Sequence, residues 1–324
     1  MKVLVTGATG LLGNTTVRLL LERGEAVRTL VRRNSDPRPL QGLPVERFTG
    51  DVLDPPSLPP AIQGADLVVH CAGLVQVGLR DQGQHAVNVE GTRSVSRACR
   101  MAGVRMVHVS SVDALRWGTR EEPADEEQPQ EGLGTRLPYS ASKRLGEEVV
   151  LQEVAEGLDA VIVNPGYLLG PWDWKPSSGR MLLEVARGLG LLAPGGGNDF
   201  CHAGDVAAGL LAAGERGATG RRYILGGEPL SYREAWALFA RITGGRPPLA
   251  TAPDLLVRAT GLGGTLLGRL TGREPAVNMG AAAVSLLPHH FSSRRAETEL
   301  GYRWRPAEDA AREAWDWFRA EGYA

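Results

Sequence analysis

The sequence predicts a doubly wound α/β fold, a parallel sheet with helices on both faces, followed by a smaller, mostly helical C-terminal lobe. Two observations indicate this architecture. Short apolar runs rich in β-branched residues alternate with helical stretches through the first half of the 324-residue chain, which is typical of stacked βαβ units. The alternation is lost after about Gly170, where the C-terminal lobe is expected to begin.

Each predicted element follows from the spacing of its apolar residues. Strands are expected over residues 2–6, 26–31, 45–48, 67–70, 105–109 and 160–164, and helices over residues 11–23, 84–101 and 139–156.

Three segments interrupt the alternation: the acidic residues 121–131, a glycine-rich turn at 195–197 and a Gly/Pro/Leu-rich stretch at 244–272. The acidic segment is expected to be a solvated connection rather than a metal site. We expect residues 1–170 and about 198–226 to form one domain, and residues 171–197 and 227–324 to form the second lobe.

Composition excludes several classes of protein. Basic and acidic residues number 36 and 37 and are spread along the chain, so no stripe for nucleic acid or a membrane surface is predicted. Cys71, Cys99 and Cys201 are far apart, which argues against a disulfide framework and a zinc site. With no secretion signal and no membrane-spanning run, we expect a cytoplasmic protein with a small-molecule partner and no metal.

A glycine-rich turn, TGATGLLGN, lies between the first strand and the first helix. Glycines let the backbone approach a pyrophosphate at a helix N-terminus, where free N–H groups and the helix dipole favour negative charge. The turn therefore predicts a Rossmann-type dinucleotide site, the alternative being a tight connection that binds nothing. The residues of this turn that we predict to contact the cofactor are Gly7, Thr9, Gly10, Leu11, Leu12 and Gly13.

Arg32 and Arg33 follow the second strand, where an NAD-selective protein usually carries an acid for the ribose hydroxyl. An arginine there can pair with a 2′-phosphate and stack on adenine, so NADP(H) is predicted over NAD(H). Asp36 lies nearby, and a solvated loop is the alternative interpretation.

Two further strand ends are expected to contact the cofactor. Asp51, after the third strand, is placed to accept a hydrogen bond from the adenine amino group, and Val52 to pack on the ring. Cys71, Ala72 and Gly73, after the fourth strand, let the backbone pass close to the cofactor.

Tyr139 and Lys143 occur in YSASK, and a spacing of four places them on one face of a helix. A free phenol has a pKa of about 10, but a neighbouring ammonium and an oxidised nicotinamide both favour the phenolate. Ser110 and Ser111 end the fifth strand, where a hydroxyl can hold a reacting oxygen against Tyr139. Each residue alone fits a structural role; together they predict proton transfer at a carbonyl or alcohol oxygen.

The motifs TGATGLLG, GDVLD, HCAG, NVEGT, HVSS, YSASK and NPGYLLGP together resemble the extended short-chain dehydrogenase/reductase superfamily over nearly the whole chain. The likeness is greatest to its dihydroflavonol-reductase-like and hopanoid-associated epimerase-like bacterial branch. It implies a triad of Ser111, Tyr139 and Lys143, since the family's serine is the second of the pair, with Lys143 also contacting the nicotinamide ribose. It further implies that Asn88 helps hold a water leading to the lysine.

The resemblance also implies a homodimer that pairs the helices beginning near residues 84 and 139, and a structural role for Asp205. It leaves Tyr167 facing the cofactor or substrate. The segment expected along the nicotinamide is Asn164, Pro165, Gly166 and Tyr167.

Trp172, Trp174 and Arg180 follow that segment, and Trp117 follows the serine strand as a candidate lid residue. Aromatic faces suit a ring or sugar, and cations suit a phosphate or carboxylate. These four residues are the predicted substrate contacts; aromatic packing of the lobe onto the sheet is the alternative.

The leading functional hypothesis is a reductase that exchanges hydride between NADP(H) and a small carbonyl compound. The second is a nucleotide-sugar epimerase with tightly held cofactor. A dehydratase fits less well, because such relatives carry Thr-Asp-Glu where this chain has Ser111, Val112 and Asp113. A non-catalytic NADP sensor is the third reading, disfavoured because Tyr139 and Lys143 are both present.

Overall fold

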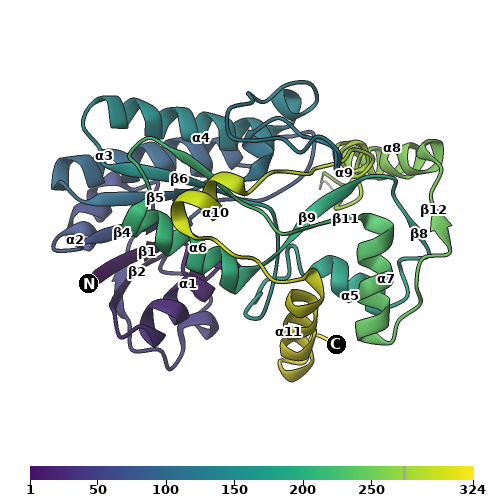
Figure 1. Ribbon diagram of the computed structural model, residues 1–324, viewed down its shortest axis with the longest axis horizontal. Helices are drawn as coiled ribbons and strands as arrows, with labels where there is room; N and C mark the ends of the chain where they lie inside the picture. The colour runs from purple at the N-terminus through teal and green to yellow at the C-terminus, as the bar shows by residue number, and fades with distance from the viewer. Residues whose placement is uncertain (273–274) are drawn as a thin grey trace.

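The computed structural model describes residues 1–272 and 275–324 and contains a central seven-stranded sheet (Figure 1). The strand order is β10-β6-β5-β4-β1-β2-β3, and every neighbouring pair is parallel. The chain proceeds from β1 to β3 on one side and returns to β4 on the other, so the topological switch lies between β1 and β4. This order confirms the predicted doubly wound fold, whose ligand sites lie at the carboxyl ends of the strands.

All six predicted strands occur, with ends within one residue of the prediction. The seventh, β10, adds to the edge of the sheet beside β6. The strands are β1 Lys2–Thr6, β2 Ala26–Val31, β3 Glu46–Thr49, β4 Leu67–His70, β5 Arg105–Val109, β6 Ala160–Pro165 and β10 Arg222–Leu225.

Both faces of the sheet are buried, because successive strand residues point to opposite sides. Val3 and Val5 pack with one layer of helices, and Leu4 packs with the other. Figure 1 shows the two layers on either side of the sheet. One layer is α1 (Leu11–Glu22), α6 (Ala203–Arg216) and α10 (Arg294–Leu300), and the other is α2 (Leu58–Ile62), α3 (Thr92–Ala102) and α4 (Pro138–Ala155).

The helix predicted over residues 84–101 differs from the prediction at its start. Its first turn is a π-helical segment, Ala86–Gly91, and only then does α3 continue to Ala102. Single π-helical turns inside helices are frequent at functional sites, and Asn88 lies within this one.

The C-terminal lobe contains a small sheet as well as helices. Its largest buried side chains are Phe200, Phe239 and Phe318, which form a separate apolar core. The sheet consists of β11 (Glu228–Ser231), β9 (Gly197–His202) and β7 (Tyr167–Leu169), and the helices packed on it are α5 (Arg180–Ala186), α7 (Tyr232–Thr243) and α11 (Ala307–Ala320).

The Gly/Pro/Leu-rich stretch 244–272 contains an element that we did not predict. After the short strand β12 (Ala250–Thr251), which pairs with β8 (Leu192–Ala193), the chain forms α8, Asp254–Thr271. A Cβ at Gly261 would lie 2.5 Å from Ala282 Cβ in α9 (Met279–Ser285). Glycine here permits close helix packing and does not break the helix.

The acidic segment 121–131 is not simply a solvated loop. Glu126 is buried, and its carboxylate accepts a hydrogen bond from the backbone N–H of Ile224 in β10 at 2.9 Å. Arg295 lies beside the same carboxylate at 3.7 Å. These contacts pin the segment to the edge of the central sheet.

The described residues contain neither a membrane-spanning helix nor a metal-binding cluster. Across residues 1–272 and 275–324, no helix is long and apolar enough to cross a membrane. Within the same residues, no group of three or more His, Cys, Asp or Glu side chains is arranged to hold a metal ion.

Candidate active site

The turn between β1 and α1 is built from close backbone contacts that only glycine permits. A Cβ at Gly13 would lie 2.3 Å from the carbonyl oxygen of Gly7, and one at Gly7 would lie 2.6 Å from the backbone nitrogen of Ala72. Gly7 has φ 68°, in the left-handed region. Because no side chain caps the α1 N-terminus at Gly10, its N–H groups suit a pyrophosphate. The cradle therefore fits the phosphates of a dinucleotide.

Arg32 and Arg33 are exposed directly after β2. The nearby acid, Asp36, is already engaged, because Arg38 Nη2 lies 2.7 Å from its Oδ2. Hydrogen bonds from Arg38 lower the pKa of Asp36 and keep it ionised. Within the described part of the chain, neither Arg32 nor Arg33 has an acidic partner.

The other predicted cofactor residues lie at the ends of β3 and β4. The Asp51 carboxylate accepts a hydrogen bond from the N–H of Leu53 at 3.0 Å, and Val52 is buried. Cys71 and Ala72 are half-buried, and Gly73 is exposed. The backbone at 71–73 is thus accessible beside the glycine turn.

The structure brings Ser111, Tyr139 and Lys143 together. Lys143 Nζ donates to the carbonyl oxygen of Val109 at the end of β5, at 3.0 Å. The Ser111 hydroxyl, two residues further on, lies close enough to the Tyr139 phenol to lower its pKa. All three side chains are buried, and Tyr139 and Lys143 are one helical turn apart on α4.

Burial shifts both titratable groups toward their neutral forms. Burial lowers the pKa of Lys143 to about 8, although Cys71, Glu147 and Asp113 oppose the shift. Burial raises the pKa of Tyr139, and Asp113 adds to this while the Ser111 hydroxyl opposes it. The charge on Lys143 is therefore sensitive to pH near neutrality.

Lys143 is expected to titrate with a midpoint of about 8, well below the usual value of 10.5. The chain contains only three lysines, Lys2, Lys143 and Lys175. Lysine labelled with carbon-13 at Cε therefore yields three NMR resonances, and Lys143→Met identifies the relevant one. Asp113→Asn should lower the midpoint further, because it removes a charge that favours the ammonium. A Lys143 midpoint near 10.5 would contradict the burial argument.

Asp113 belongs to the same cluster, although the sequence analysis did not assign it to the site. The Ser111 hydroxyl donates to Asp113 Oδ2 at 3.3 Å and accepts from the Asp113 N–H at 3.1 Å. Burial raises the pKa of Asp113 to about 6. Tyr232 was also missed: burial raises the pKa of its phenol, while Asn198 opposes this shift and Asp113 adds to it. The sequence feature that could have indicated Asp113 is its position two residues after the second serine, Ser111.

Asn88 connects two parts of the site. Its Nδ2 donates to the carbonyl oxygen of Leu74 at 3.0 Å and to Ser142 Oγ at 2.9 Å. Its Oδ1 accepts from the N–H of Leu74 at 2.8 Å. Asn88 therefore ties the segment after β4 to helix α4, which carries Tyr139 and Lys143.

The end of β6 and the start of β7 hold the backbone around the site. Asn164 is buried, and its Nδ2 donates to the backbone oxygen of Ser111 at 2.9 Å and to Glu147 Oε1 at 2.6 Å. The Tyr167 hydroxyl donates to the carbonyl oxygen of Ser178 at 2.8 Å. Asn164 thus fixes the backbone that carries Ser111, while Tyr167 contacts the loop before α5.

Three of the predicted substrate residues are engaged elsewhere. Arg18 of α1 lies 4.6 Å above the ring of Trp172, and Trp174 packs edge-on against Trp317 of α11 at 5.1 Å. Arg180 forms an exposed ion pair with Glu184, one helical turn further along α5. The contacts of these three residues do not bring them to Ser111, Tyr139 or Lys143.

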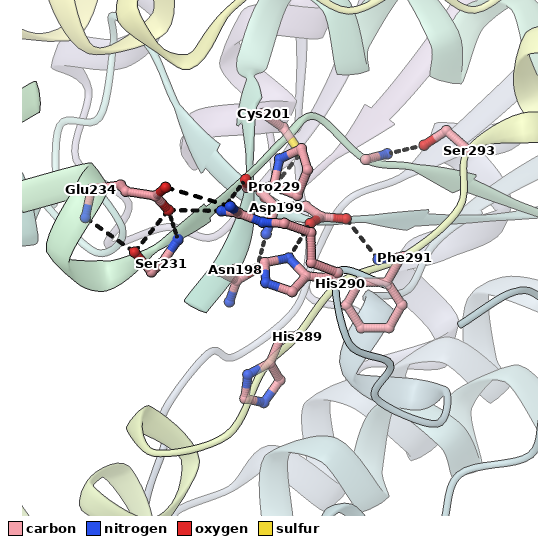
Figure 2. Close-up of polar contacts among 12 residues, drawn as sticks. Asn198, Asp199, Cys201, Pro229, Ser231, Glu234, His289, His290, Phe291 and Ser293 are labelled. Carbon is pink, nitrogen blue, oxygen red and sulfur yellow. Dashed lines mark hydrogen bonds and ion pairs between the residues drawn. The ribbon is translucent and has the colours of Figure 1, made fainter. Parts of the chain in front are cut away.

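Trp117 packs instead against a polar cluster in the C-terminal lobe. Its ring lies 4.3 Å from that of His289. Asp199 of β9 pairs through Oδ1 with His290 Nδ1 at 2.8 Å, and its Oδ2 accepts from the N–H of Phe291 at 2.8 Å (Figure 2). Gly118, which follows Trp117, forms an isolated antiparallel β-bridge with His290. Asp199 therefore anchors the segment against which Trp117 rests.

Comparisons with known proteins agree with this fold. The model of the NAD dependent epimerase/dehydratase family matches residues 3–226. Sterol demethylase protein B of Methylococcus capsulatus is 38% identical over 99% of both chains, and a putative dihydroflavonol 4-reductase of Synechocystis is 35% identical over 98% of this chain and 95% of its own. A solved nucleoside-diphosphate-sugar epimerase from Pseudomonas aeruginosa has a TM-score of 0.83 at 28% identity, covering 100% of this chain and 99% of its own.

The fold and these relatives define an enzyme of the oxidoreductase class with a Rossmann-type nucleotide domain. The chain belongs to the NAD dependent epimerase/dehydratase family, within the extended short-chain dehydrogenase/reductase superfamily.

Proposed function

We propose that the protein reduces the carbonyl group of a small molecule, or oxidises the corresponding alcohol, with NADP(H) as cofactor. The observation that carries the proposal is the gathering of Ser111, Tyr139 and Lys143 at the end of β5, together with a glycine turn whose shape fits dinucleotide phosphates. The similarity to a putative dihydroflavonol 4-reductase supports reduction as the reaction.

The chain's own residues would handle the proton. When bound, the nicotinamide supplies or accepts a hydride. The Ser111 hydroxyl holds the substrate oxygen, and the Tyr139 phenol donates a proton to that oxygen during reduction or accepts it during oxidation. The Lys143 ammonium, fixed by the carbonyl of Val109, stabilises the phenolate that remains. The carboxylate of Asp113 acts through Ser111 as a positioning group.

We assign NADP(H) preference to Arg32. Within the described residues, the exposed guanidinium has no acidic partner, because the nearby Asp36 is already paired with Arg38. A charge-assisted bond from arginine to a phosphate contributes roughly 1.5–3 kcal/mol, or about tenfold or more in affinity. The 2′-phosphate distinguishes the two cofactors, so this contribution applies to NADPH alone.

Arg32→Ala is expected to weaken NADPH binding by about tenfold or more and to leave NADH binding unchanged. Titrations of both cofactors followed by fluorescence measure the two dissociation constants. Arg319→Ala, which removes an exposed arginine from α11, is the matched control and should change neither. An equal loss for NADPH and NADH would refute the role of Arg32 in phosphate recognition.

We propose an apolar ring compound as the substrate. The two curated relatives bear names that refer to a sterol and a dihydroflavonol. Tyr232, whose phenol is buried and feels the charge of Asp113, places an aromatic ring near this cluster. Oxidation of NADPH with a panel of ketosteroids and dihydroflavonols, compared with nucleotide sugars, tests the assignment.

The nucleotide-sugar epimerase is the second candidate, favoured by the likeness to the Pseudomonas enzyme over the whole chain. An epimerase returns the hydride to its substrate and keeps the cofactor. Heat-denatured protein should then release stoichiometric NAD(P), and a nucleotide sugar should isomerise without net oxidation of NADPH.

We further propose a homodimer formed by α3 and α4, the helices that dimerise in many relatives. Light scattering of the purified protein would give twice the mass of the 34.6 kDa chain.

A further inference from the structure

Helix α8 carries an apolar face that points away from the rest of the protein. Leu255 is 79% exposed and Leu270 is 86% exposed. At about 100° per residue, six leucines fall within an arc of about 140°. This leucine face consists of Leu255, Leu256, Leu262, Leu266, Leu267 and Leu270.

The opposite side of α8 attaches the helix to the lobe. Gly261 and Gly268 are the buried positions, on the side turned about 180° from the leucines. Gly261 packs on Ala282 of α9. Figure 1 shows α8 and α9 at the end of the lobe distant from β2 and β3. The leucines therefore form the solvent-exposed side of α8 and take no part in its packing against the lobe.

Exposed leucines also precede the helix in the chain. Leu192 and Leu249 are exposed, at the paired strands β8 and β12, and the N–H of Leu249 donates to the carbonyl of Leu191 at 2.9 Å. A concentration of exposed apolar side chains, such as the leucine face of α8, often marks an interaction site.

Unpaired arginines accompany the leucine face. Arg246, Arg258 and Arg269 are exposed, and none has an acidic partner among the described residues. In the helical projection Arg258 and Arg269 lie along one edge of the leucine face. Residues 244–272 contain just one acid, Asp254, although the whole chain has a net charge of -1.

Many other arginines among the described residues are paired with an acid, unlike these three. Arg100, for example, bonds to Glu153 at 2.7 Å, and Arg305 bonds to Asp205 at 2.8 Å. A row of free guanidinium groups beside a leucine face complements a layer of phosphates above acyl chains.

We propose that the leucine face of α8 docks on an anionic lipid bilayer, with its leucines in the acyl boundary and Arg258 and Arg269 at the lipid phosphates. The helix lies in the plane of the surface and does not span it. Docking uses none of the candidate active-site residues, so it stands independently of the proposed function.

Docking has a consequence for the candidate site that does rest on the proposed function. Asn278, which caps α9, donates to the carbonyl of Val77 at 3.0 Å. Val77 follows the backbone at 71–73 beside the glycine turn. The docked surface would thus border the segment that leads to the site, where an apolar substrate would arrive from the bilayer.

The test is co-sedimentation of the purified full-length protein with vesicles of phosphatidylcholine alone or mixed with phosphatidylglycerol. Wild type should sediment with the anionic vesicles and much less with the neutral ones. Leu266→Ser combined with Leu270→Ser should weaken this binding by about tenfold or more, because two leucine side chains no longer enter the acyl boundary. Arg258→Gln combined with Arg269→Gln should weaken it by a similar factor on anionic vesicles alone.

Leu53→Ser, which removes an exposed leucine from the nucleotide-binding side, is the matched control and should bind like wild type. Each variant should retain the wild-type far-ultraviolet circular dichroism, since the substituted side chains are exposed. Undiminished binding by the double leucine variant would overturn the proposal. So would absence of wild type from both vesicle pellets, or a dimer in light scattering that only the leucine variant dissociates, which would assign the face to a second copy.

Discussion

Tyr139→Phe is expected to lower kcat/KM for carbonyl reduction by about 1,000-fold, within the range by which a positioned general acid accelerates such steps. The substitution removes one buried hydroxyl and keeps the ring, so the packing of α4 should persist. The Ser111 hydroxyl donates to Asp113, which leaves the Tyr139 phenol as the proton source of this cluster. NADPH affinity should hardly change, because the phosphate cradle lies on α1.

The rate comparison uses NADPH oxidation with a carbonyl compound that wild type reduces. Tyr323→Phe is the matched control: it removes a hydroxyl that bonds to the carbonyl of Trp174 at 2.8 Å near the C-terminus, and it should leave kcat/KM unchanged. A Tyr139→Phe enzyme within tenfold of wild type would contradict the assignment of Tyr139 as proton donor, and equally low rates in both variants would point to general damage.

Asp199→Ala is expected to lower the free energy of unfolding by about 2–5 kcal/mol, because two buried donors each lose their acceptor at a cost of roughly 1–3 kcal/mol. Asp199 is 1% exposed, and its two oxygens engage His290 and the N–H of Phe291. Alanine leaves both donors buried without an acceptor. The segment at 289–291 should then loosen from β9.

Urea unfolding followed by circular dichroism measures the change in stability. Asp199→Asn retains one oxygen acceptor and should lose less than the alanine variant. Glu184→Ala, which breaks an exposed pair with Arg180, should cost only about 0–1 kcal/mol. A loss below about 1 kcal/mol for Asp199→Ala would mean that water replaces the carboxylate without penalty.

Most of the nucleotide domain could be predicted because the residue patterns that define its strands and its glycine turn are local in the sequence. A fully buried parallel strand is a short run of β-branched residues, and β1, β4 and β5 were located to the residue. The glycine turn was equally clear, since the close contact of Gly13 with Gly7 permits no side chain. The order of the second serine before Tyr139 and Lys143 then indicated the cluster that we propose as catalytic.

The residues that were missed depend on contacts that spacing does not reveal. Asp113 reaches Ser111 because a short helical turn, Val112–Ala114, folds its backbone N–H onto the serine hydroxyl. Trp172 and Trp174 lie close to the predicted site in sequence, but Arg18 and Trp317 from distant helices hold their rings. Proximity in sequence was therefore a poor guide to the substrate side.

The sequence by itself determined the sheet, the glycine turn, the exposed arginines after β2 and the tyrosine and lysine of α4, because periodicity and steric exclusion act over a few neighbouring residues. Only the tertiary structure decided that residues 254–271 form a helix with its leucines outward, and that Asp199 meets His290 from 91 positions away. Glycines in this stretch suggested a connection until α9 supplied the close packing that makes them helical contacts. Such pairings depend on the whole chain, since each stabilises a local conformation that its own residues only weakly prefer.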